Sequence, residues 1–261
     1  MKKFVALFIA LVFTLSLTLS AFAAVDVRML VPCYFYPSSQ GSDWDRMIDM
    51  ADDYGSDIMA IVNPNNGPGT SVNSDYTSVL TSFKNAGGYP LGYVHTSWGT
   101  RDIDDVKDDI DNWYTFYSPY GILLDEQSAA ANTTYYYYYQ EIYNYIKNKD
   151  QYAAVFSNAG TTTRSEYLWY DGQNTTDAIG IFENYTDYTN FENSSWTSSY
   201  SRYNFISLCY NVPNLSTAED YIDNAVGDGY SGYIYCTDDN DGTIWDELPS
   251  YFEDMCSYCF D

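Results

Sequence analysis

The amino-acid sequence predicts a single α/β domain with the architecture of a (β/α)8 barrel. Eight short apolar segments recur about every thirty residues, which is the length of a βαβ unit. Most of them are apolar along their whole length, a pattern typical of parallel strands that are covered on both faces. Amphipathic stretches separate the segments, and eight repeats favour closure into a barrel. An open doubly wound sheet is the alternative, but no G-x-G-x-x-G motif follows the first strand to support it.

The first 23 residues have the features of a secretory signal peptide. Two lysines precede an apolar run from Phe4 to Leu19, and the small-residue pattern AFA ends at Ala23. Cleavage after Ala23 would leave residues 24–261 as the barrel domain of a secreted, extracellular protein. An uncleaved N-terminal anchor is the alternative. No later segment is apolar enough to cross a bilayer, so we expect no membrane contact after cleavage.

The eight predicted strands are each followed by a turn or polar residue. In chain order they are MLVPCYFY (29–36), IMAIV (58–62), LGYVH (91–95), GILLD (121–125), AAVFS (153–157), AIGIFE (178–183), FISLCY (205–210) and GYIYCT (232–237). Each contains β-branched or aromatic residues, which are enriched in strands.

Helical periodicity is clear in several of the intervening segments. Apolar residues stand at i, i+3, i+4 and i+7 in two of them, which are Trp44, Met47, Ile48 and Ala51, and then Ile103, Val106, Ile110, Trp113 and Tyr117. The run YYYYY at 135–139 predicts a packed helix capped within 132–134. Ser216 and Glu219 have the spacing of a capping box. The segments after the fifth and sixth strands have a poor helical pattern.

The chain is strongly acidic. It has 36 acidic and 11 basic residues, and loss of Lys2 and Lys3 with the signal peptide would leave 9 basic residues and a formal charge of −27. Nucleic acid is therefore not an expected partner, because phosphate binding needs basic patches. Strong acidity is typical of soluble extracellular proteins. The alternative is that its field concentrates a cationic substrate. We expect the protein to be a monomer.

Five cysteines are an odd number for an exported chain. Cys33, Cys209 and Cys236 fall in apolar runs, where a free thiol behaves as a small hydrophobe. Cys256 and Cys259 either form a local disulfide or remain unpaired. With one histidine and no second cysteine pair, the sequence argues against a zinc site.

Polar residues gather at the ends of the predicted strands, where a (β/α)8 barrel carries its chemistry. They would converge on one mouth of the barrel and are Tyr36, Asn63, Asn66, His95, Asp125, Glu126, Asn158, Glu183, Tyr210, Thr237 and Asp238. Acids distributed by chance would instead be scattered along the strands. His95 is a candidate substrate contact, with a purely structural histidine as the alternative.

The stretch YGILLDEQS ends a predicted strand in two adjacent acids. Successive strand side chains point to opposite faces, so Asp125 should continue the facing of Leu123 towards the barrel axis while Glu126 leans over the rim. Glu183 ends the sixth strand. Two carboxylates across a barrel mouth suit glycosidic cleavage, one as nucleophile or base and one as acid, and this chemistry needs no cofactor. The alternative is that the Asp-Glu pair caps the next helix.

The sequence is rich in aromatic residues, with 30 tyrosines and 6 tryptophans. Flat aromatic faces stack on the apolar faces of sugar rings. The candidates near strand ends are Tyr36, Tyr93, Trp98, Tyr185 and Tyr210. We interpret TDDNDGT (237–243) as a turn, because its alignment with a calcium loop fails at both end positions. No metal site is predicted.

Five blocks in the chain resemble a known family. VPCYFYPSS, IVNPNNGPG, LGYVHTSWGTRDIDDVKDDID, YGILLDEQS and IFENY, in this order, are similar to the spherulin 4 (spherulation-specific family 4) proteins, grouped as glycoside hydrolase family 135. The resemblance extends from about Met29 to Asp238. It implies a (β/α)8 barrel and endo-acting hydrolysis of α-1,4-linked N-acetylgalactosamine or galactosamine in secreted polysaccharides such as galactosaminogalactan.

The resemblance also implies roles for the acids. The Asp125–Glu126 pair and Glu183 would carry catalysis, with Asp125 as nucleophile and Glu183 as acid/base. A partly deacetylated galactosamine polymer is a polycation, which matches the acidity of the chain. The high tyrosine content and the weak fifth and sixth helices depart from the family.

Three hypotheses about function follow. The first is a retaining glycoside hydrolase with its carboxyl groups about 5–5.5 Å apart, whereas about 6.5 Å or more would favour inversion. The second is a catalytically silent carbohydrate-binding barrel. The third is a structural cell-surface or matrix protein.

Overall fold

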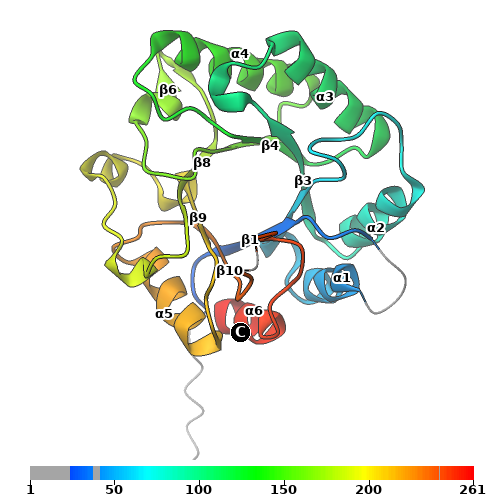
Figure 1. The fold of residues 1–261 in the computed structure, drawn as a ribbon, viewed down its shortest axis with the longest axis vertical. Coiled ribbons are helices and arrows are strands. Elements are labelled where there is room, and N and C mark those ends of the chain that lie inside the picture. Colours follow the sequence, from blue (N-terminus) through cyan, green and yellow to red (C-terminus); the bar gives the residue numbers. More distant parts are fainter. Residues whose placement is uncertain (1–23, 38–41, 241) are drawn as a thin grey trace, which may run out of the picture.

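The computed structural model describes residues 24–37, 42–240 and 242–261, and these form the predicted barrel (Figure 1). The predicted signal peptide lies outside the described residues. Eight parallel strands close on themselves, each pairing with the next along the chain. They are β1 (Arg28–Cys33), β2 (Ile58–Val62), β3 (Tyr89–His95), β4 (Gly121–Asp125), β5 (Ala154–Asn158), β8 (Ala178–Asn184), β9 (Phe205–Cys209) and β10 (Tyr233–Cys236). All eight predicted strands are confirmed.

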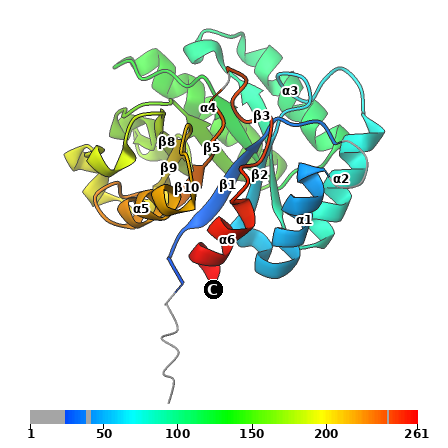
Figure 2. The same cartoon turned by 60° about the horizontal axis from the view of Figure 1, so that its bottom comes forward.

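Helices form an outer layer that buries the second face of most strands (Figure 2). They are α1 (Asp43–Tyr54), α2 (Ser74–Asn85), α3 (Ile103–Phe116), α4 (Thr133–Lys149), α5 (Leu215–Val226) and α6 (Phe252–Phe260). The predicted apolar faces are the buried ones, as Trp44, Met47 and Ala51 show in α1. The tyrosine-rich run lies in α4, which Asn132 caps by accepting a hydrogen bond from the Thr134 N–H.

The predicted capping box of α5 is wrong. The helix begins two residues earlier than predicted, because Asn214 occupies the N-cap position and its Oδ1 accepts the Thr217 N–H at 3.1 Å. Asparagine is among the most favourable N-cap residues. Ser216 therefore lies inside the first turn and cannot cap it.

Two positions of the outer layer lack an α-helix. Between β5 and β8 the chain forms η3 (Ser165–Tyr167) and a hairpin of β6 (Trp169–Tyr170) and β7 (Gln173–Asn174). Between β8 and β9 it forms η4 (Tyr188–Asn190), η5 (Ser195–Ser199) and η6 (Arg202–Asn204). These segments are the ones whose sequence has poor helical periodicity. Aromatic rings cover the strands instead, as where Trp196 packs on Phe205 at 5.5 Å between ring centres.

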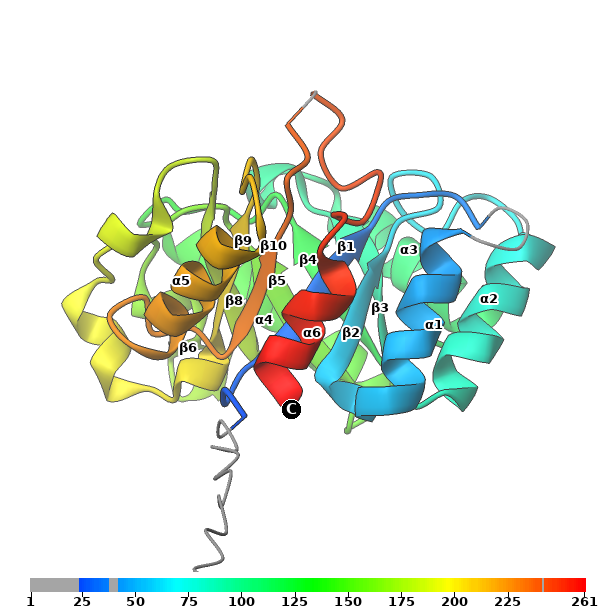
Figure 3. The ribbon, with the colours of Figure 1, turned by 90° about the horizontal axis from the view of Figure 1, so that it is seen from below.

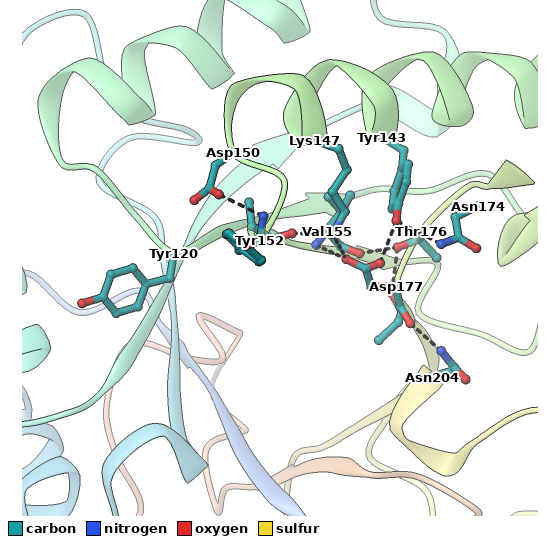
Figure 4. Close-up of polar contacts among 12 residues, drawn as sticks. Tyr120, Tyr143, Lys147, Asp150, Tyr152, Val155, Asn174, Thr176, Asp177 and Asn204 are labelled. Atoms are coloured by element: carbon teal, nitrogen blue, oxygen red, sulfur yellow. Dashed lines mark hydrogen bonds and ion pairs between the residues drawn. The ribbon is translucent and has the colours of Figure 1, made fainter.

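A polar cluster joins α4, β5 and β8 where these two strands begin (Figure 4). The Asp177 carboxylate accepts hydrogen bonds from the Tyr143 hydroxyl at 3.0 Å, from Lys147 Nζ at 2.8 Å and from the Val155 N–H at 2.9 Å. These contacts tie the start of β8 to β5. The resulting register places Asn158 opposite Gly180 at the other end of the pair.

The cysteines do not form disulfides. All five are buried and unpaired, including Cys256 and Cys259 in α6. Burial raises the pKa of the Cys259 thiol, which makes it a poor nucleophile. In the described part of the chain, no helix is both long enough and apolar enough to span a membrane.

Candidate active site

The carboxyl ends of the eight strands and the loops that follow them form one end of the barrel. The loop after β10 projects furthest there (Figure 3). Asp125 is the last residue of β4 and Glu183 stands near the end of β8. β5 pairs with both strands and ends in the buried Asn158, so this amide lies between the two acids.

The Asn158 amide links the two carboxylates directly. Its Nδ2 donates to Asp125 Oδ1 at 3.0 Å and to Glu183 Oε2 at 2.6 Å. Its Oδ1 accepts the Gly160 N–H at 2.9 Å, which fixes the orientation of the amide. Because both acceptors bond to one nitrogen, they can be no further apart than the two distances laid end to end, about 5.6 Å.

Gly180 in β8 makes room for this bridge. A Cβ added at position 180 would lie 2.2 Å from Asn158 Oδ1 and 3.1 Å from its Cγ. Contacts of that length do not occur between such atoms, so any other residue at 180 would displace the amide. The glycine is needed here for the space it leaves.

Asp125 is half-buried, and this burial raises its pKa. Three donors oppose this effect by stabilising the ionised carboxylate, namely the Glu126 backbone N–H, the Tyr93 hydroxyl and the Asn158 amide. The negative charge of Glu126 raises the pKa again. Asp125 is thus a desolvated carboxylate held by a defined set of hydrogen bonds.

Glu183 has a raised pKa with burial as its main cause. The Asn158 amide lowers the pKa, the charge of Asp125 raises it, and a hydrogen bond from the Trp245 side chain lowers it. Two half-buried carboxyl groups that share one amide and repel each other resist simultaneous ionisation. This is the electrostatic arrangement of an acid and a base that work as a pair.

Glu126 lies at the rim because the strand has already ended at this residue. Its φ of 52° is in the left-handed region, where the chain turns away from the direction of β4. The carboxylate accepts the Ser97 N–H at 3.2 Å, and the backbone carbonyl accepts the Trp98 N–H at 2.7 Å. Glu126 therefore holds the loop between β3 and α3 in place.

The predicted polar contacts after β2 and β3 are close to one another. His95 Nδ1 lies 3.3 Å from the Asn66 carbonyl oxygen and 3.4 Å from its Nδ2. Asn63 has a local role, since its Oδ1 accepts the Gly67 N–H at 2.9 Å within the NPNNGPG turn. Asp238 is half-buried at the start of the loop after β10. Across the described ranges, no cluster of three or more acidic, histidine or cysteine side chains is arranged to hold a metal ion.

The predicted aromatic contacts fall into separate groups. Trp98, after β3, is 60% exposed, and Tyr185, after β8, is 62% exposed. The rings of Tyr185 and Tyr210 lie 5.8 Å apart. These exposed rings stand on both sides of the strands that carry the acids. Tyr36 is tied to α2, where its hydroxyl donates to Asp75 at 2.6 Å, and no contact links it to the acids.

Sequence reasoning missed two residues of the site. Tyr34 packs edge-on against Tyr93 at 5.8 Å, and burial together with the charge of Asp125 raises its pKa. The first strand was expected to extend to Tyr36, but it ends at Cys33, so Tyr34 is the first residue at the mouth. The position of Tyr34 near the end of the apolar run VPCYFY could have indicated that it lies at the mouth.

Trp245 is the second missed residue and lies in the loop after β10. It is 4% exposed and has a φ of 82°, which is unusual for a bulky side chain. Its backbone N–H donates to Asp239 Oδ2 at 3.0 Å, and its backbone carbonyl accepts the Tyr34 N–H at 3.1 Å. Its ring packs against Tyr210 at 5.9 Å. Nothing in a loop sequence signals such a placement.

A family model, a relative in sequence and a solved structure all match most of this chain. The family model for the spherulation-specific family 4 matches residues 28–259. Spherulin-4 of Physarum polycephalum is 32% identical over 250 residues, which is 92% of this chain and 72% of that protein. The crystal structure of Aspergillus clavatus Sph3 in complex with GalNAc superposes with a TM-score of 0.75 at 22% identity, covering 90% of this chain and 97% of Sph3.

A more distant structural match has the same fold. Catalytic-site mutants of active domain 2 of a thermostable chitinase from Pyrococcus furiosus, complexed with chito-oligosaccharides, match with a TM-score of 0.53 at 10% identity. The match covers 91% of this chain and 95% of that one. At such identities both structural matches establish the fold alone.

Proposed function

Because the chain belongs to the spherulation-specific family 4 proteins, we propose that it is a secreted, endo-acting glycoside hydrolase of polysaccharides with α-1,4-linked N-acetylgalactosamine or galactosamine. The observation that carries this proposal is the pair of half-buried carboxylates, Asp125 and Glu183, joined by one amide. Sph3, which shares the fold, was crystallised with GalNAc, and this supports the choice of sugar.

The distance between the acids supports a retaining mechanism. Retaining enzymes hold their two carboxyl groups about 5–5.5 Å apart, and inverting enzymes hold them about 6.5–9.5 Å apart to admit a water molecule. The upper limit of about 5.6 Å between the two bonded oxygens lies below the inverting range. This separation favours direct attack on the sugar by a carboxylate over attack by an intervening water.

The reaction then has two steps. An Asp125 oxygen attacks the anomeric carbon while Glu183 gives its proton to the departing glycosidic oxygen, and an ester between the sugar and Asp125 forms. Glu183, now ionised, takes a proton from water, whose oxygen attacks the anomeric carbon and breaks the ester. The raised pKa of Glu183 favours its protonated form, which the first step needs. The donors around Asp125 favour its ionised form.

The exposed rings support an endo mode of action. Trp98 follows β3, and the Tyr185–Tyr210 pair follows β8 and β9, so aromatic faces flank the acids on β4 and β8 from both sides. A chain that extends past the cleaved bond in both directions can stack on each. The acidic charge of the protein, −25 over the full sequence, favours a partly deacetylated, cationic polymer.

Reducing-end release from galactosaminogalactan, and from a fully N-acetylated α-1,4-linked polymer, tests the proposal. We expect the mature protein to release ends, Asp125→Asn and Glu183→Gln to release none, and Glu141→Gln to retain activity. Glu141 is an exposed acid of α4 paired with Lys107, which makes it a matched control. The first product formed should be the α-anomer, and a β-anomer would establish inversion instead.

The other outcomes select a different function. Folded protein that binds these polymers and leaves them intact would be a catalytically silent carbohydrate-binding barrel. Folded protein that neither binds nor cuts them would have a structural role at a surface or in a matrix. Either result would overturn the hydrolase proposal.

A further inference from the structure

A second pocket lies at the end of the barrel opposite the carboxylates. It opens where β5 and β8 lack an outer helix, and its volume is about 230 Å³. We call it the surface pocket and define it by the lining residues Trp169, Asn174, Thr176, Asp177, Tyr200 and Asn204. Asp177 precedes the first residue of β8 whereas Glu183 lies near its last, so the pocket is separate from the mouth. Figure 4 shows four of these side chains gathered together.

The two amides of the surface pocket are held in fixed orientations. Asn204 Nδ2 donates to the Asp177 carbonyl at 2.7 Å, and Asn174 Nδ2 donates to the Tyr143 hydroxyl at 3.0 Å. No described residue donates to Oδ1 of either amide. The pocket therefore presents two preorganised hydrogen-bond acceptors to a ligand, and preorganisation reduces the entropic cost of binding.

The charge of the surface pocket favours neutral ligands. Its one carboxylate, Asp177, already accepts hydrogen bonds from Tyr143, Lys147 and Val155, and Lys147 balances its charge. The acceptors left for a ligand are the Oδ1 atoms of Asn174 and Asn204. These uncharged oxygens suit the hydroxyl and amide donors of a neutral molecule. This differs from the mouth, where Asp125, Glu126 and Glu183 make the site acidic.

Aromatic rings form the other walls. Trp169 is 49% exposed, and its Nε1 has no hydrogen-bond partner among the described residues. Tyr200 is held edge-on against Trp196 at 5.7 Å between ring centres. A half-exposed indole beside fixed acceptors is suited to the apolar face and the hydroxyl edge of a sugar. The volume lies below the roughly 300–1,000 Å³ of pockets for drug-sized ligands, which limits the occupant to one ring.

We propose that the surface pocket binds one neutral hexopyranose unit of a polysaccharide, separately from the site at the mouth. A polymer held at this end of the barrel stays at high local concentration near the carboxylates, even when the chain in the mouth has been cut and released. The inference rests on the proposed function only for the choice of N-acetylgalactosamine as the sugar used to test it.

The test is a nitrogen-15 NMR titration of Glu183→Gln protein with an α-1,4-linked N-acetylgalactosamine trisaccharide, following the indole N–H signals. Loss of one signal in Trp169→Phe identifies Trp169, and Trp98→Phe identifies a reporter at the mouth. We expect the Trp169 signal to shift saturably. Asn174→Ala should weaken this binding about fivefold, the worth of one neutral hydrogen bond. Tyr152→Ala should not, because Tyr152 is 83% exposed and outside the pocket.

The readouts separate this inference from the proposed function. A stationary Trp169 signal beside a shifting Trp98 signal would overturn the surface pocket and leave the mouth as a sugar site. A Trp169 shift that Asn174→Ala leaves unchanged would also overturn it. A saturable, Asn174-dependent shift of Trp169 supports the pocket whether or not the wild-type protein cuts the polymer.

Discussion

Replacing Gly180 by alanine should break the hydrogen bonds from Asn158 to Asp125 and Glu183 while both acids stay in the sequence. The new Cβ would lie 2.2 Å from Asn158 Oδ1, whereas ordinary contacts begin at 3.4 Å. The amide must therefore move by more than 1 Å. A shift of that size away from Gly180 breaks the short bridge to Asp125 and Glu183, because these hydrogen bonds are 3.0 and 2.6 Å long.

The size of the effect follows from the charge of the acceptors. A hydrogen bond to a charged group contributes about 1.5–3 kcal/mol. Loss of the Asn158 bond should therefore raise the pKa of Asp125. Because the nucleophile must be ionised and about 1.4 kcal/mol corresponds to a tenfold change in an ionisation equilibrium, the acidic limb of the activity profile should move up by about one to two pH units. We expect kcat/KM at neutral pH to fall about tenfold or more.

The assay is the pH dependence of kcat/KM on a soluble α-1,4-linked oligosaccharide. Gly227→Ala is the matched control, since a Cβ there meets only ordinary contacts of 3.5 and 3.6 Å. Asn158→Ala removes the amide without a clash and should reproduce the upward shift of the acidic limb. The kcat/KM of the double variant Gly180→Ala/Asn158→Ala should be no lower than that of Asn158→Ala alone. An unchanged acidic limb in Gly180→Ala would refute the bridge as the group that holds Asp125 ionised.

Three further outcomes are expected. Trp245→Phe removes the side-chain donor to Glu183, so the pKa of this acid should rise and the alkaline limb should move up by a fraction of a pH unit; a downward move would contradict the contact. Glu183→Gln should raise Tm at pH 7, because burial raises the folded-state pKa of Glu183 and its ionisation then costs stability; the gain should shrink as pH falls below the ordinary pKa of a glutamate side chain, and a gain that does not change with pH would argue against it. Glu126→Gln should lower kcat less than Asp125→Asn does, because Glu126 holds the Ser97 loop; equal losses would place Glu126 in the chemistry.

Local patterns in the sequence determined most of the barrel. Strands and helices depend on apolar residues at spacings of a few positions, and burial of β4 or of the α1 face follows from the same spacing. The gathering of acids at strand ends was likewise visible, since parallel strands place all their carboxyl ends together. The two missing outer helices were signalled by segments without helical periodicity. The N-cap of α5 was misplaced because two suitable polar residues lie two positions apart.

Only the tertiary structure decided how the site is assembled. Asn158 bridges the acids because the β5–β8 register sets it opposite Gly180, and that pairing involves segments that are distant in the sequence. Trp245 reaches Glu183 through a loop whose path depends on contacts with Asp239 and Tyr34. The Tyr36 hydroxyl is held by Asp75 and Asn73 at the start of α2. Such contacts depend on where separate elements meet in space, and a local pattern of residue types carries no information about that.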